Sequence, residues 1–248
     1  MFRKGFVVWA LTLLLLGSST AMATGKQDYR VAVVGSAPPM SYLDAQGKLT
    51  GFNIEMAHAL CRIMSIRCQL QPMPLGEIID TLASGGADFA VASLLATPER
   101  RQKVIFSKPY FRSVSVWLGQ PSATIGSADV TVGTIKGSAQ ARYAEAKGWK
   151  IHPVASHTAF PKLLASGQIQ AVILPMMTGV ALQQAQPVQA LELHSVVLDD
   201  PSIAGDVAIS IAPGNAALLP QINAAIDQVK ASGEFDRINS RFLPFRLQ

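Results

Sequence analysis

The side chains that could perform catalytic chemistry are few and lie apart in this sequence. No histidine has metal-ligand spacing to another among His58, His152, His157 and His194. Only His157, which precedes a predicted helix, is a candidate site residue, and His58 is expected on a helix face. Asp199 and Asp200 form a carboxylate pair, but the Pro201 that follows is more typical of a solvated loop than of acid–base chemistry.

Sequence motifs for catalysis or cofactor binding are also missing. Gly-x-Ser-x-Gly, the P-loop and the dinucleotide glycine fingerprint do not occur. Because there is no nucleophile, base or metal set, the sequence favours a binding role, with no cofactor and no metal expected.

The first 23 residues have the pattern of a secretory signal peptide. Arg3 and Lys4 supply the positive start, residues 6–16 are apolar except for one threonine, and Ala21-Met22-Ala23 places the cut after Ala23. A membrane anchor is the alternative, but this stretch is well short of the roughly 20 residues that a spanning helix needs. We therefore expect export and cleavage.

Composition and charge limit the class of protein further. The chain has 248 residues, of which 49% are apolar and 15% charged, so it is not a disordered protein. Removal of Arg3 and Lys4 with the leader lowers the net charge from +5 to +3, and no run of five basic residues occurs. These features do not indicate nucleic-acid binding.

Cys61 and Cys68 are the two cysteines of the chain. Export places them in an oxidising compartment, where they can pair. A short loop of this kind would add about 2–3 kcal/mol to the free energy of unfolding. Two free buried thiols are the alternative.

Strand and helix patterns alternate in the first half of the chain. The sequence predicts strands at 29–34, 68–71 and 89–95, and helices at 53–64, with Asn53 as N-cap, and at 75–83. This alternation is typical of an α/β fold with a mainly parallel sheet.

The pattern then starts again. Thr97-Pro98-Glu99 begins a short helix, because it combines a capping hydroxyl, a proline at the first position and an acid in the first turn. The remaining predicted elements are strands at 113–118, 130–135, 151–154, 171–174 and 207–211, and helices at 139–147, 158–166, 215–229 and 235–242. Two successive α/β units suggest two small lobes.

Three segments carry a resemblance to a known family. They are residues 38–57, which include PPMSY and GKLTGFNIEMA; residues 88–110, which include DFAVAS, TPER and FSKPY; and residues 219–242. Together they resemble the polar-amino-acid family of periplasmic solute-binding proteins, family 3 of the bacterial extracellular binding proteins. The resemblance spans 29–245.

The resemblance implies a two-lobed type II periplasmic-binding fold, whose lobes are joined by two crossing hinge strands and close on a ligand. Lobe 1 would comprise 24–113 and 208–248, and lobe 2 would comprise 114–207. Such proteins act in the periplasm, usually as monomers, and deliver an amino acid to an ABC permease in the inner membrane. The Cys61–Cys68 spacing also resembles a disulfide of basic-amino-acid binders in this family.

The resemblance also assigns binding residues. Arg100 matches the arginine that holds the ligand carboxylate, a role that suits the forked donors of a guanidinium; a surface arginine is the alternative, and Arg101 is the better candidate for that. Ser138, followed by Ala139, matches the hydroxyl of the second lobe. Ser93 matches a polar position at the end of the third strand.

Departures from the family pattern change the expected ligand. Pro175 stands where an acid commonly binds the ligand ammonium, and Leu95 replaces a hydroxyl residue. Since a buried ammonium without a counter-charge is costly, we expect a carboxylate with an apolar body. The expected lining residues are Met40, Tyr42, Leu75, Leu95, Pro175 and Met176.

Two other functions stay open at this point. The first is an accessory or sensor protein that uses the same fold to contact a periplasmic partner, which the lost acid at Pro175 favours. The second is an enzyme, because the family includes a cyclohexadienyl dehydratase; no general acid is evident beside Arg100.

Overall fold

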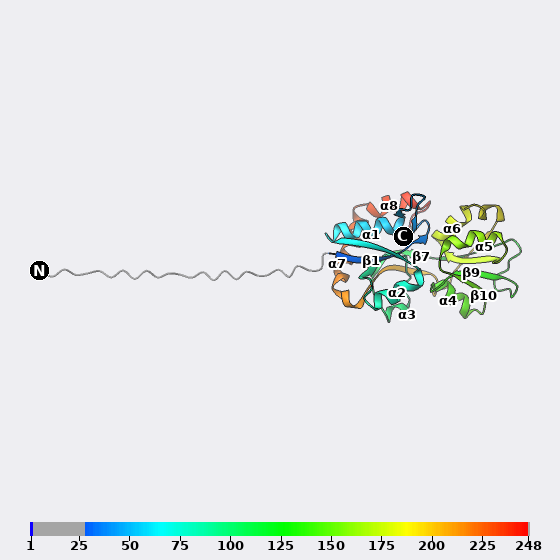
Figure 1. The fold of residues 1–248 in the computed structure, drawn as a ribbon, viewed down its shortest axis with the longest axis horizontal. Helices are drawn as coiled ribbons and strands as arrows, with labels where there is room; N and C mark the ends of the chain where they lie inside the picture. Colours follow the sequence, from blue (N-terminus) through cyan, green and yellow to red (C-terminus); the bar gives the residue numbers. More distant parts are fainter. Residues whose placement is uncertain (2–27, 248) are drawn as a thin grey trace.

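The computed structural model describes residue 1 and residues 28–247, so the predicted signal peptide and its cleavage site lie outside the described residues. Figure 1 shows two α/β lobes side by side, each with helices packed around a central sheet. Among residues 28–247, no helix is long and apolar enough to cross a membrane.

The first lobe is built on a five-stranded sheet in the order β5-β1-β6-β13-β7. Its strands are β1 (Asp28–Val34), β5 (Arg67–Met73), β6 (Phe89–Ala90), β7 (Ile105–Ser113) and β13 (Gly205–Ile211). β1 is parallel to both β5 and β6, whereas β13 is antiparallel to β6 and β7. A small sheet joins β2 (Ser36–Ala37), β3 (Ser41–Leu43) and β4 (Leu49–Thr50).

The second lobe repeats this plan with the sheet order β10-β9-β11-β8-β12. Its strands are β8 (Ser115–Gly119), β9 (Thr131–Ile135), β10 (Lys150–Val154), β11 (Ala171–Pro175) and β12 (His194–Leu198). The chain therefore passes between the two sheets twice, after β7 and before β13. The two-lobed fold predicted from the sequence is confirmed.

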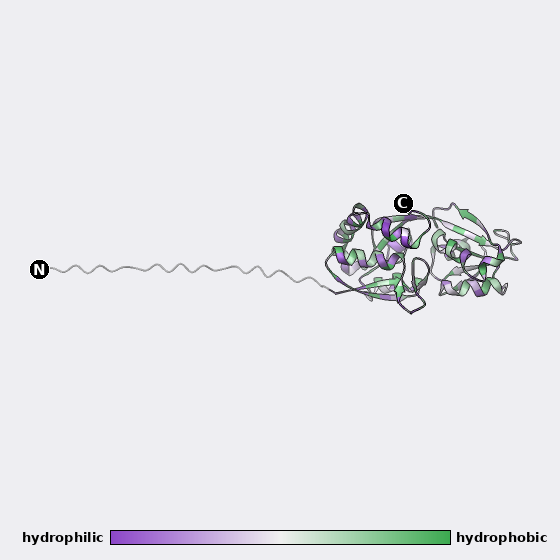
Figure 2. Ribbon diagram, turned by 90° about the horizontal axis from the view of Figure 1, so that it is seen from above, coloured by the Kyte–Doolittle hydropathy of each residue, from purple (hydrophilic) through white to green (hydrophobic). Residues whose placement is uncertain are grey.

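Helices cover both faces of each sheet. They are α1 (Phe52–Ile63), α2 (Leu75–Ala83), α3 (Pro98–Arg101), α4 (Ala139–Ala146), α5 (Phe160–Ala165), α6 (Met176–Gln184), α7 (Leu219–Ala231) and α8 (Glu234–Phe242), with short 3-10 turns at His157–Ala159, Val188–Leu191 and Pro213–Leu218. Figure 2 shows the hydrophilic and hydrophobic sides of these helices.

Strand β1 shows why its lobe needs helices on both faces. Val31 and Val33 join one buried cluster, and Ala32 and Val34 join another. Because successive side chains of a strand point to opposite faces, an apolar run such as this one must be covered twice. α1, α7 and α8 pack on the Val31 side, and α2 packs on the Ala32 side.

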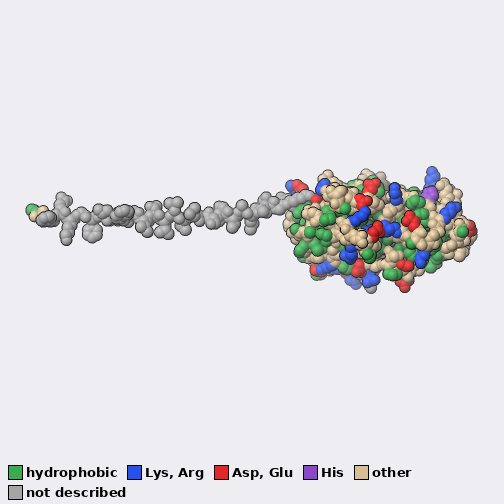
Figure 3. All heavy atoms as spheres, turned by 90° about the horizontal axis from the view of Figure 1, so that it is seen from below, with side chains coloured by type: hydrophobic (Ala, Val, Ile, Leu, Met, Phe, Trp, Pro, Cys, Tyr) green, Lys and Arg blue, Asp and Glu red, His purple; other side chains and the backbone are tan. Residues whose placement is uncertain are grey.

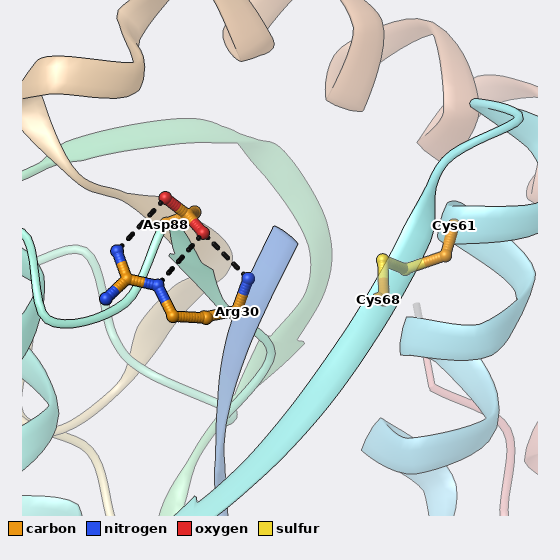
Figure 4. Close-up of a disulfide and its surroundings, with 4 residues drawn as sticks. All are labelled: Arg30, Cys61, Cys68 and Asp88. Atoms are coloured by element: carbon orange, nitrogen blue, oxygen red, sulfur yellow. Dashed lines mark hydrogen bonds and ion pairs between the residues drawn. A yellow bond between two sulfur atoms is a disulfide. The ribbon is translucent and has the colours of Figure 1, made fainter. Parts of the chain in front are cut away.

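Two features at one end of this sheet are drawn in Figure 4. The buried Asp88 carboxylate accepts hydrogen bonds from the Arg30 backbone N–H at 2.7 Å and from the Asn215 side chain at 2.9 Å. Cys61 and Cys68 form a disulfide that joins α1 to β5, which confirms the predicted pairing.

Candidate functional site

A small cavity of about 30 Å³ lies where the two lobes meet. Both lobes contribute to its wall, which consists of Leu75, Ser93, Leu94, Leu95, Arg100, Ser113, Ser138, Ala139, Gln140 and Pro175. Seven of the ten binding and lining residues predicted from the sequence are in this set, so residues far apart in the chain are brought together.

Arg100 is placed in this cavity by the start of α3. The Thr97 hydroxyl caps the helix by accepting the Arg100 backbone N–H at 3.4 Å, and Pro98 occupies the first turn. The Arg100 residue is only 5% exposed. Its neighbour Arg101 is exposed and lies over the Phe106 ring, so the two adjacent arginines differ in burial.

The guanidinium of Arg100 spans the junction between the lobes. It donates from Nη1 to the Leu95 carbonyl at 3.0 Å and from Nη2 to the Gly137 carbonyl at 3.3 Å. Leu95 precedes α3 in the first lobe, whereas Gly137 precedes α4 in the second. Two of the five N–H donors of Arg100 are therefore used by carbonyls, and three remain.

The charge of Arg100 is not balanced by an ion pair. Among residues 28–247, no carboxylate lies within 4 Å of its guanidinium nitrogens. Its pKa is lowered to about 10, mainly by burial and also by the nearby positive charge of Arg142, whereas Glu99 opposes both effects. Glu99 forms its ion pair with Arg142 instead, at 2.9 Å. The site is thus a cationic pocket in need of an anion.

Ser138 lies opposite Arg100 in the second lobe. It is the N-cap of α4, and its Oγ accepts the Ala141 backbone N–H at 2.9 Å. The preceding Gly137 has a φ of 76°, which favours glycine. The capped helix start, with Ala139 in the cavity wall, adds partial positive charge to the same pocket.

Ser93 is fixed by a buried hydrogen-bond network. Its φ is 53°, and its Oγ is 2.9 Å from Asn53 Nδ2 and 3.1 Å from Asn53 Oδ1. The Tyr110 hydroxyl donates to the same Oδ1 at 3.0 Å, and burial raises the pKa of this hydroxyl. The network therefore fixes Ser93 within the apolar segment 89–95.

Asn53 does not have its predicted role as N-cap. Gly51 caps α1, and Asn53 lies inside the helix, where its amide holds Ser93 and Tyr110. Gly51 has a φ of 122°, and a Cβ added there would lie 2.6 Å from the Met40 carbonyl oxygen. The close backbone approach requires glycine at position 51 and moves the cap upstream of Asn53.

Three predicted lining residues lie away from the cavity. Met40 is 2% exposed in the core of the first lobe, where its carbonyl accepts the Asn53 backbone N–H at 2.7 Å. Tyr42 lies in β3 and pairs with Ser36 and Thr50. Met176 packs against the core clusters. The cavity has in addition Leu94, Ser113 and Gln140, which no side-chain pattern indicated.

The other candidate side chains are separate from the Arg100 cavity. His58 is exposed on α1, and among residues 28–247 no cluster of three metal-ligating side chains occurs. Asp200 stabilises its own turn, because its Oδ1 accepts the Ser202 backbone N–H at 2.9 Å. His157 lies at the junction between the lobes and contacts the Ser36 backbone.

A wider groove of about 750 Å³ lies beside the cavity, and the two share Leu95 and Ala139. Its rim carries charges of both signs, including Glu99, Arg142 and Asp206. Figure 3 shows basic and acidic side chains interspersed over one face of the molecule. The surface therefore has no extended patch of one charge on that face.

Comparison with known proteins matches residues 29–245 to the sequence profile of the bacterial extracellular solute-binding proteins, family 3. The arginine-binding periplasmic protein of Mannheimia haemolytica is 25% identical over 238 residues, covering 94% of this chain and 98% of that protein. The ABC transporter arginine-binding protein 1 of Escherichia coli K12 is 25% identical over 237 residues, covering 93% and 96%.

Solved structures agree with these relatives. An ancestral arginine-binding protein bound to glutamine superimposes with a TM-score of 0.77 at 27% identity, covering 88% of this chain and 98% of that chain. The fold, the family profile and the names of the relatives all indicate a binding protein.

Proposed function

Because the chain belongs to family 3 of the bacterial extracellular solute-binding proteins, we propose that it captures a small carboxylate between its two lobes and delivers it to an ABC importer. The observation that carries this proposal is the buried Arg100 guanidinium, which has no carboxylate within 4 Å in the part of the chain that the structure describes. Its remaining donors suit both oxygens of a ligand carboxylate.

The wall of the cavity supports a ligand without an ammonium group. Its polar side chains are one guanidinium, three hydroxyls and one amide, and none is a carboxylate. Pro175, where the family commonly has an acid, has no side-chain acceptor. An ammonium buried here would be unpaired, at a cost of several kcal/mol. Leu75, Leu95 and Pro175 instead favour an apolar body next to the carboxylate.

The positions of the binding groups support closure by population shift. Arg100 and Ser93 belong to the first lobe, whereas Ser138 and Ala139 belong to the second. A carboxylate that contacts both sides binds the closed conformation better than the open one, so it shifts the equilibrium toward closure. Closure is the change that a permease would detect.

Titration calorimetry with a panel of carboxylates and the twenty amino acids tests this function. We expect binding of carboxylates and a loss of roughly 2–5 kcal/mol of binding free energy in Arg100→Ala. The matched control is Arg101→Ala, whose guanidinium lies over Phe106 outside the cavity, and its affinity should be unchanged. Equal affinities of the two variants would contradict the site, and tight binding of an ordinary α-amino acid would contradict the ligand class.

The remaining parts of the proposal concern the whole protein. We propose export by a signal peptide at residues 1–23, a periplasmic location, action as a monomer, and a transport role rather than catalysis. The names of the relatives support the location and the transport role, since they are periplasmic and ABC transporter binding proteins. Mass spectrometry of the protein from a periplasmic extract would show an N-terminus at Thr24 if cleavage follows Ala23.

A further inference from the structure

We propose that the free edge of strand β12 (His194–Leu198) binds an extended segment of a partner protein, which adds to the second sheet as a further strand and carries basic residues at its ends. This edge is separate from the ligand site, because no residue of β12 lines the Arg100 cavity. The inference therefore concerns a protein partner and does not depend on the identity of the ligand.

The edges of the two five-stranded sheets differ in how they are protected. Of the four edge strands, β5, β7 and β10 each contain a proline together with a lysine or arginine. Proline lacks a backbone donor, and a basic side chain on an edge disfavours the approach of another strand. The protecting residues are Arg67 and Pro72 in β5, Lys108, Pro109 and Arg112 in β7, and Lys150 and Pro153 in β10. β12, with the sequence HSVVL, contains neither kind of residue and pairs with β8 without a bulge.

The β12 strand is exposed along almost its whole length, and only Leu198 is half-buried. Val196 is 39% exposed and Val197 is 54% exposed. Because consecutive side chains of a strand point to opposite faces, apolar surface is present on both sides of this edge. Among residues 28–247, no backbone–backbone hydrogen bond from outside the sheet uses residues 194–198. The outward N–H and C=O groups are therefore open to a further strand.

The residues that flank β12 are acidic. Glu192 lies two residues before the strand, Asp199 and Asp200 follow it directly, and residues 163–229 contain no lysine or arginine. The positive charge of Lys147 acts on Asp200. Within residues 28–247, however, neither Glu192 nor Asp199 has an ion pair. A partner strand with basic ends would thus place opposite charges beside these two carboxylates.

The same charges disfavour a second copy of this chain as the partner. If two β12 strands paired antiparallel about Val196, Glu192 of each would face Asp200 of the other. Like charges directly opposite each other destabilise a strand pair. A segment with apolar, β-branched residues at its centre and lysine or arginine at its ends matches both the valines and the carboxylates. Main-chain hydrogen bonds would supply its affinity, and these side chains its specificity.

Fluorescence anisotropy of the mature protein with three labelled peptides tests this proposal. The peptides are Lys-Thr-Val-Val-Thr-Lys, its charge-reversed form Glu-Thr-Val-Val-Thr-Glu, and Lys-Thr-Pro-Pro-Thr-Lys, which cannot complete a strand ladder. We expect the first peptide to bind at least about tenfold more tightly than the other two at low salt. Its advantage over the glutamate peptide should shrink at high salt, because exposed charges are screened. Equal binding of the three peptides would overturn the proposal.

Val197→Lys tests the edge itself. It gives β12 the basic residue that the other edges have, and it should weaken binding of the lysine peptide about tenfold. The matched control is Leu43→Lys, because Leu43 is an apolar residue of similar exposure, 55%, in the first lobe. This control should leave the peptide affinity unchanged. An equal affinity of both variants for the peptide would overturn the assignment to β12.

The charge and the oligomeric state are tested separately. The double variant Glu192→Gln and Asp199→Asn should lower the affinity for the lysine peptide about threefold, because two exposed charge pairs are lost. An unchanged affinity would overturn the choice of a basic partner. Sedimentation velocity should show no association of the wild type through this edge. A wild-type dimer that dissociates in Val197→Lys would assign the edge to a second copy and overturn the proposal.

Discussion

His157 is a residue whose charge is coupled to contact between the lobes. It lies in the turn before α5 of the second lobe, and its ring meets the backbone of Ser36 in the first. Its Nδ1 atom is buried and has no hydrogen-bond partner in the structure. Burial lowers the pKa of His157 from 6.5 to about 4, and the Ser36 backbone opposes this only in part.

The lowered pKa of His157 predicts a loss of stability in acid. The unfolded chain, with a histidine pKa of 6.5, binds more protons than the native protein between this pH and about 4. The free energy of unfolding therefore falls as the pH decreases through this interval, by about 1–2 kcal/mol at pH 5. Urea titrations at pH 7 and pH 5 measure the difference.

Two histidine variants assign this pH dependence. His157→Gln should remove most of it, because glutamine does not titrate. His58→Gln should keep it, because His58 is exposed on α1. Parallel stability curves for the wild type and His157→Gln would show that another group is responsible.

A side chain was predictable from the sequence where the residues next to it set its backbone conformation. Thr97 and Pro98 fix the start of α3, and this start decides that Arg100 rather than Arg101 is buried. Met40 was not predictable in the same way, because its burial depends on a contact with the distant start of α1. The sequence of a loop does not indicate whether an apolar side chain packs in the core of its lobe or lines the cavity between the lobes.

The disulfide joins the last turn of α1 to the first residues of strand β5. Reduction should lower the free energy of unfolding by about 2–3 kcal/mol, because the loop between Cys61 and Cys68 is short. Urea titrations with and without a reductant measure this effect. The double variant Cys61→Ala and Cys68→Ala should be insensitive to the reductant, and a wild type equally insensitive would contradict the prediction.

One predicted element differs from the structure because its residues are buried but do not all pair with a neighbouring strand. Residues 89–95 are apolar and were expected to be one strand, but β6 contains only Phe89 and Ala90. The backbone then turns through the positive φ of Ser93 and forms a single bridge from Leu95 to Val207. The residues are buried as expected, but the network with Asn53 replaces the ladder. By contrast, α2 has the predicted bounds, since its ends are set by Pro74 and by the turn at Ser84.

An ion pair of Arg142 connects the two lobes. It pairs with Glu99 across the junction at 2.9 Å and donates to the Gly137 carbonyl at 3.2 Å. Arg142→Gln removes this pair and a positive charge near the site. Both effects weaken carboxylate binding, but the pair is partly exposed, so we expect a change of at most about 1 kcal/mol.

The dependence on salt concentration distinguishes an electrostatic effect of Arg142→Gln on carboxylate binding from a packing defect. The difference between Arg142→Gln and wild type should shrink in calorimetry at high salt, because exposed charges are screened. Arg241→Gln is the control, since Arg241 pairs with Glu55 between α8 and α1 within the first lobe. A difference that does not depend on salt would contradict the electrostatic explanation.

The two-lobed plan could be predicted because each lobe has its own alternation of strands and helices. The lobe boundaries at 113–114 and 207–208 stay a prediction. The degree of closure could not be predicted, because it depends on which backbones meet. Gly76 and Gly137 lie in different predicted units, and only the folded chain brings them together.

The position of β13 has a consequence for biosynthesis. This strand fills the gap between β6 and β7, although it follows β7 by almost a hundred residues. While the chain emerges from a ribosome or a translocation pore, the first sheet stays in two parts, β5-β1-β6 and β7. Their facing edges have no partner strand until Gly205–Ile211 arrives. Since open edges pair readily with other chains, a holding chaperone should be needed longest just before this segment is delivered.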